Sequence, residues 1–86
     1  MMSEIKTMAA VKSSLQLLNA AGGAGIREDA LREQISFAAG GIDAFEIDAI
    51  LTRLNERKWM TWHRDPVWCH IRWTITDKGA LALQAM

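Results

Sequence analysis

The sequence predicts one α+β domain, mostly α, that spans residues 1–86 and contains three helices, a two-stranded β-hairpin and a short C-terminal helix. Up to residue 58, apolar residues recur at helical spacing, and the pairs Gly22-Gly23 and Gly40-Gly41 divide this part into three segments. From Trp59 to Thr76, apolar and polar residues alternate instead, which is typical of β-strands. No linker or repeat interrupts the 86 residues, a length that suits one small domain.

The first two helices are predicted from apolar residues that recur at intervals of three and four. Ser3 is the expected N-cap of the first helix, and Gly22-Gly23 ends it. Its apolar stripe consists of Met8, Val11, Leu15 and Leu18. The second helix is shorter and ends at Gly40-Gly41. Its apolar side consists of Ile26, Ala30, Leu31 and Ile35.

The third helix has the strongest local signature. Asp43 and Glu46 are spaced as a capping box, in which each side chain satisfies a backbone N–H group at the start of the helix. Ile42 and Ile47 are spaced as the hydrophobic staple that accompanies such a box. The apolar stripe of this helix consists of Ile47, Ile50, Leu51 and Leu54.

The hairpin is predicted from the segments WMTWHR and CHIRWTIT, with Asp65-Pro66 in the turn between them. One side of the second strand is apolar and should face the core, and it consists of Cys69, Ile71, Trp73 and Ile75. Trp73 is therefore the best core candidate. For Trp62, packing against the fold and base stacking are both open, and Trp68 at the tip either folds back or contacts a partner.

Composition and motifs exclude several classes of protein. Ten basic and ten acidic residues give zero net charge, although the bases concentrate after residue 52. Cys69 is the only cysteine and no secretory signal is visible, so we expect a cytoplasmic protein without a disulfide. No apolar run approaches the roughly 20 residues of a membrane span. Catalytic residues, cofactors and metals are not expected, because His63, Cys69 and His70 lack paired ligand spacing and no nucleophile has a partner.

The stretch LNERKWMTWHRDPVWCHIRWTITDKGALAL resembles the end of winged-helix regulators of the MarR type. The matching residues are Leu54, the apolar pair Trp59-Met60, the tip Arg64-Asp65-Pro66 and the closing motif Ile75-Thr76-Asp77-Lys78-Gly79. The resemblance covers roughly Thr7 to Leu83 and implies a winged helix-turn-helix fold. In that fold the third helix would enter the major groove and the hairpin would flank it on the DNA backbone. The chain departs from the family in lacking long terminal helices and in carrying acids on the third helix.

Two functions stay open, because carboxylates on a recognition helix repel DNA unless they accept from a cytosine amine. The first is a small, stand-alone DNA-binding transcriptional regulator of bacterial or phage origin. Its base contacts would be Thr52 and Arg53, and its phosphate contacts Arg57, Lys58, Arg64 and Arg72. The alternative is a winged-helix module for protein–protein interaction that binds no nucleic acid. Its contact face would be the outer side of the third helix, with Phe45, Asp48, Ala49 and Glu56.

Surplus apolar residues on the two terminal helices predict a homodimer. On the first helix, Ala10, Leu17 and Ala21 lie roughly opposite the predicted core stripe. On the last helix, whose cap is Thr76 or Asp77, Leu81 and Ala85 are expected to face inward. The dimer contact would then consist of Leu17, Leu83 and Met86. The alternative is that Leu17 and Leu83 pack on each other within one chain.

Overall fold

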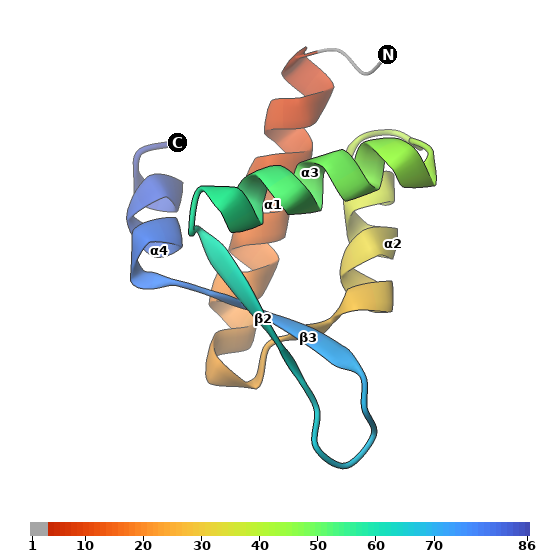
Figure 1. Ribbon diagram of the computed structural model, residues 1–86. Coiled ribbons are helices and arrows are strands. Elements are labelled where there is room, and N and C mark those ends of the chain that lie inside the picture. Colours follow the sequence, from red (N-terminus) through yellow and green to blue (C-terminus); the bar gives the residue numbers. More distant parts are fainter. Residues whose placement is uncertain (1–3) are drawn as a thin grey trace.

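The computed structural model describes the chain from Glu4 to Met86, and its side chains from Thr7 onward. The elements are α1 (Glu4–Ala21), a 3-10 turn η1 (Gly22–Ala24), β1 (Ile26–Arg27), α2 (Glu28–Ala38), α3 (Ala44–Glu56), β2 (Met60–Arg64), β3 (Ile71–Ile75) and α4 (Asp77–Gln84). The predicted order of three helices, a hairpin and a terminal helix is confirmed. The expected N-cap Ser3 lies outside the described residues. Figure 1 shows α3 crossing α1, with the hairpin extending away from the helices.

The second helix begins later than predicted, because Ile26 belongs to a strand. Ile26 pairs with Trp73 and Arg27 pairs with Arg72, so β1 lies antiparallel beside β3. The sheet order is β1-β3-β2, which places β3 at its centre. Ile26 still packs against the core, but from the sheet. Ala30, which was assigned to the apolar side of the helix, is exposed.

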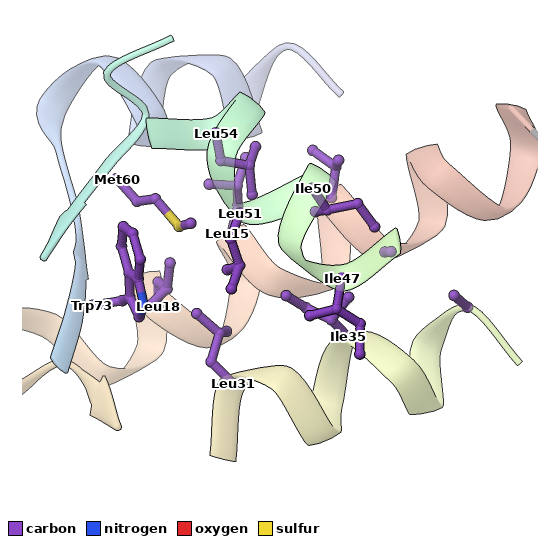
Figure 2. Packing of buried hydrophobic residues seen from close by; sticks show 13 residues of the cluster. Leu15, Leu18, Leu31, Ile35, Ile47, Ile50, Leu51, Leu54, Met60 and Trp73 are labelled. Carbon is purple, nitrogen blue, oxygen red and sulfur yellow. The ribbon is translucent and has the colours of Figure 1, made fainter. Parts of the chain in front are cut away.

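One hydrophobic core joins the three long helices and the sheet (Figure 2). The predicted stripe of α3 is buried as a whole, and Trp73 of β3 is buried as expected. Burying one Leu or Ile side chain contributes roughly 1.5–3 kcal/mol, so this cluster dominates the stability of the fold. The labelled members in Figure 2 are Leu15, Leu18, Leu31, Ile35, Ile47, Ile50, Leu51, Leu54, Met60 and Trp73.

The start of α4 fastens the base of the hairpin to the helices. Thr76 caps α4 by accepting a hydrogen bond from the Gly79 N–H group at 3.0 Å, and its hydroxyl also donates to the carbonyl oxygen of Lys58 at 2.5 Å. A Cβ atom at Gly79 would lie 2.0 Å from the carbonyl oxygen of Trp59. Only glycine therefore allows the helix to approach the chain before β2 this closely. This contact explains the spacing of Thr76 and Gly79 in the closing motif.

The predicted core stripe of α1 is confirmed except at Met8, whereas the predicted inner and outer faces of α4 are wrong. On α1, Ala10 is buried in the core and Met8 is exposed. The core face is rotated toward Ser14, whose hydroxyl can be buried because it donates to the carbonyl oxygen of Ala10 at 2.6 Å.

On α4, Leu81 is 66% exposed, whereas Leu83 and Met86 pack against the core. Gly79 and Leu83 are four residues apart and share one face of α4, and Met86 follows just after the helix ends. The close approach of Gly79 to Trp59 turns that face inward. Two of the three residues predicted for a dimer contact are therefore used within their own chain.

Candidate nucleic-acid interface

The outer face of α3 is exposed, as the helical wheel predicted. Phe45, Ala49, Thr52 and Glu56 all lie on the surface, and Phe45 is 80% exposed. The helix is held at its N-terminus by Asp43, whose side chain accepts from the Glu46 N–H group at 2.8 Å. This half of the predicted capping box is confirmed. The four residues of the outer face point away from the core, so they are accessible to a ligand.

The acids of α3 have different surroundings. Asp48 forms an ion pair with Arg32 of α2, so its charge is largely neutralised within the chain. Glu46 is half-buried, and its Oε2 atom is buried without a hydrogen-bond partner in the described part of the chain. Among the described side chains, Glu56 forms no ion pair. Of the acids that raised doubt about a recognition helix, only Glu56 is thus both exposed and unpaired.

The two predicted base-contacting residues share a hollow of about 410 Å³ on the outer face of α3, and each also lines a second hollow to one side of it. Thr52 lines a hollow of about 220 Å³ between α2, α3 and the sheet, together with Asp48 and Asn55. In the same hollow, the Nε1–H group of Trp73 donates to Glu28 at 3.3 Å. Arg53 instead lines a groove between α1 and α3.

The outer face of the sheet carries a row of basic residues that crosses all three strands. Arg72 of β3 pairs directly with His63 of β2 on one side and with Arg27 of β1 on the other. Directly opposed side chains share one face of a sheet. Like charges at such positions repel, and two carboxylates offset this: Asp29 pairs with Arg27 at 3.0 Å and Asp65 with Arg72 at 3.4 Å.

Sequence reasoning missed Arg27 and His63 as members of this row. A two-residue strand gives almost no alternation, so β1 could not be predicted, and without it Arg27 has no neighbour in the sheet. His63 alternates correctly in its own strand, but its position opposite Arg72 depends on the hairpin register.

The predicted phosphate-binding residues form two groups. Arg57 and Lys58 are exposed at the junction of α3 and β2, where the guanidinium of Arg57 lies 5.2 Å from the centre of the Trp59 ring. Arg64 is exposed at the far end of β2. β2 is five residues long, so its two ends lie roughly 13 Å apart. Arg72 is half-buried and already paired with Asp65.

The tip of the hairpin is an ordered turn built around Asp65. Its carboxylate accepts from the N–H groups of Val67 at 2.8 Å and Trp68 at 3.0 Å. The hydrogen bonds from Trp68 and Val67, together with the Arg72 guanidinium, lower the pKa of Asp65 below its ordinary value of 3.8. Cys69 was predicted to face inward, but it is exposed and has a left-handed φ of 59°. The second strand of the hairpin therefore begins at Ile71, two residues later than the predicted start at Cys69.

Within the described part of the chain, no group of three or more His, Cys, Asp or Glu side chains is arranged to hold a metal ion. In the same residues, no helix combines the length and apolar character needed to cross a membrane.

Two crystal structures resemble this arrangement, and both are of the PcaV transcriptional regulator from Streptomyces coelicolor. One matches with a TM-score of 0.74 and 21% sequence identity, covering 98% of this chain and 57% of the regulator chain. The chain has a winged helix-turn-helix fold. In this fold, α2 and α3 form the helix-turn-helix, and β2, β3 and the turn between them form the wing. The predicted resemblance to MarR-type regulators is thus confirmed for the fold.

The second structure is of PcaV in complex with its natural ligand, with a TM-score of 0.63, 21% identity and coverage of 86% of this chain and 48% of the other. The winged-helix chain described here therefore spans about half the length of that regulator. Neither the protein-family models nor the curated proteins include a match to its sequence.

Proposed function

We propose that this winged-helix chain binds double-stranded DNA through α3 and the wing, as a cytoplasmic transcriptional regulator of bacterial or phage origin. The observation that carries the proposal is the pairing of Asp48 with Arg32, because it removes one of the main electrostatic objections to α3 approaching a duplex. Thr52 and Arg53 are then the base-contacting residues. Arg57, Lys58, Arg64 and Arg72 are the phosphate-contacting residues, and the sheet row adds Arg27 and His63.

The test is a change of charge on the outer face of α3. The double variant Glu56→Lys with Asp48→Asn removes two carboxylates and adds one cation, so it should raise affinity for random duplex DNA about tenfold. Asn at position 48 keeps the shape of Asp, and both sites are exposed, so the fold should tolerate the change. The matched control is Glu33→Lys on α2 with Asp77→Asn on α4, which makes the same change of charge at exposed sites outside α3 and the wing and should leave affinity nearly unchanged. Equal affinity of wild type and the α3 variant would mean that α3 does not approach DNA.

A second function is favoured by the exposure of Phe45. This ring lies at the edge of a groove of about 380 Å³ between α1 and α3, which Ala49 and Arg53 also line. Exposed aromatic residues beside a groove are typical of protein contact sites. In this alternative, Phe45, Asp48, Ala49 and Glu56 bind a protein partner and no nucleic acid is bound. The same double variant would then abolish the protein complex and leave DNA affinity negligible.

The proposed regulator is a homodimer, because a two-fold pair would double a weak contact with DNA. Leu83 and Met86 pack within their own chain and α4 lies against α1, so less apolar surface is available for pairing than the sequence suggested. Leu17 remains half-buried on α1. Light scattering at micromolar concentration decides the point. A mass of twice 9.6 kDa supports the dimer, and a mass of 9.6 kDa overturns it.

A further inference from the structure

The wing tip holds two large apolar side chains away from the fold. Val67 is 74% exposed and Trp68 is 70% exposed, although half of the chain is apolar and a core lies nearby. Trp62, which lies in strand β2 before the tip, is about half exposed. Exposed apolar side chains that cluster at the end of a protruding hairpin indicate a contact site.

Hydrogen bonds around Asp65 fix the backbone that carries these side chains. One oxygen of the Asp65 carboxylate accepts from the backbone of both Val67 and Trp68. The other oxygen accepts from Arg72 at 3.4 Å. The backbone closes the loop, because the Asp65 N–H group donates to the His70 carbonyl oxygen at 2.7 Å and the Cys69 N–H group donates to the Asp65 carbonyl oxygen at 2.8 Å. The apolar side chains are therefore presented on an ordered turn.

The charge around the tip suits a polyanion. Asp65 is the only acid between Met60 and Ile75, and it is paired with Arg72. Arg64 and the two imidazoles of His63 and His70 are exposed. A two-stranded ribbon as a whole fits the major groove, so only the side chains at its tip would enter a minor groove about 6 Å wide. Figure 1 shows the tip extending beyond the helices, where a duplex can reach it.

We propose that the wing tip inserts the side chains of Val67 and Trp68 into the minor groove of a DNA duplex and unstacks one base step. This inference rests on the proposed function, since it requires that the chain binds DNA. Apolar wedges between base pairs kink a duplex, and the cost is lowest at flexible pyrimidine–purine steps such as TA and CA. The wedge would thus add a preference for deformable sequences without any hydrogen bond to a base edge.

The test uses the full chain and duplexes that carry 2-aminopurine at a central TA step, with anisotropy to measure affinity. Wild type should raise 2-aminopurine fluorescence severalfold on binding, because the base loses its stacking partner. The double variant Val67→Ser with Trp68→Ala should lose this rise and bind roughly tenfold more weakly. Its salt dependence should equal that of wild type, since no charge is removed.

Three further variants separate the wedge from a general loss of structure. Leu81→Ala removes an apolar side chain of similar exposure from α4, at the end of β3 opposite the tip, and should change neither signal. Asp65→Asn keeps an oxygen that can accept from the Val67 and Trp68 backbone, whereas Asp65→Ala does not. The rise in 2-aminopurine fluorescence should persist in Asp65→Asn and decrease in Asp65→Ala.

Each outcome is decisive. If wild type binds DNA without a fluorescence rise, or the double variant keeps the rise and the affinity, the wedge is wrong and DNA binding stands. If wild type binds no duplex at low salt, the proposed function fails, and the wedge fails with it. A tip that instead binds vesicles of anionic phosphatidylserine, with loss in the double variant and no DNA binding, would overturn both.

Discussion

Asp48 on α3 pairs with Arg32 of α2, sixteen residues away in sequence, whereas Asp65 in the wing pairs with Arg72 of the same hairpin. The first pair neutralises a surface that would otherwise repel DNA. The second pair shapes a turn and sets a carboxylate beside Arg72, a proposed phosphate contact. The two pairs therefore leave different charges exposed. The outer face of α3 is nearly neutral, whereas the wing still exposes Arg64 and the two histidines.

The largest effect is expected where α4 fastens the base of the wing. Gly79→Ala places a Cβ atom against the carbonyl oxygen of Trp59, which is backbone and cannot rotate away. We expect a loss of about 3 kcal/mol in the free energy of unfolding, measured by urea denaturation. Gly23→Ala is the control, because nothing lies within 4 Å of its Cβ position. Equal stability of the two variants would contradict the close approach.

The two wing arginines, Arg64 and Arg72, should differ in whether Asp65→Asn restores the DNA affinity that is lost when each is replaced. Arg72→Ala removes a cation and also leaves the Asp65 carboxylate unpaired, so DNA affinity should fall about tenfold and the salt slope by about one unit. Adding Asp65→Asn should restore part of this loss. Arg64→Ala should lower the salt slope by a similar amount, but Asp65→Asn should not rescue it, because Arg64 contacts the Cys69 carbonyl oxygen instead. Identical rescue in both backgrounds would argue against this division.

On α3, the loss of Arg32 should weaken DNA binding although Arg32 is not a proposed phosphate contact. Arg32→Ala frees the charge of Asp48, and we expect affinity to fall roughly threefold. Asp48→Asn in the same chain should reverse the fall. Because both side chains are partly exposed, a double-mutant cycle on stability should give a coupling of only about 0.5 kcal/mol. Failure of Asp48→Asn to restore binding would mean that Arg32 acts directly on DNA.

The smallest effect concerns pH. The pKa of Asp65 is lower in the folded chain than its ordinary value of 3.8, so its ionised form stabilises the fold above that pH. This contribution is lost as pH falls below 3.8 through the folded-state pKa. The stability difference between wild type and Asp65→Asn should stay constant from pH 7 to about 5 and shrink toward pH 2. A difference that grows on acidification would contradict the assigned cause.

Most of the fold could be predicted from local sequence patterns. The Asp43 cap, the buried stripe of α3 and the position of Trp73 all follow from spacing within a few residues. The failures involve contacts between distant segments. Ser14 is polar, so periodicity could not place it in the core, and the face of α4 depends on how Gly79 meets Trp59.

The candidate site divides in the same way. Exposure of Phe45, Ala49, Thr52 and Glu56 followed from the helical wheel. The partner of Asp48 did not, because Arg32 lies on another helix and nothing in the spacing joins them. The row of Arg27, Arg72 and His63 needed the sheet order and register.

The most direct test of DNA binding is the salt dependence of affinity for random duplex DNA, measured by fluorescence anisotropy between 50 and 200 mM salt, a range chosen to separate ionic from apolar binding. Contacts from Arg57, Lys58, Arg64 and Arg72 to phosphates should give a slope of log K against log salt of about −3 to −4. Measurable binding at low salt with such a slope is the predicted result. Absence of binding at 50 mM salt, or a slope near zero, would contradict the account.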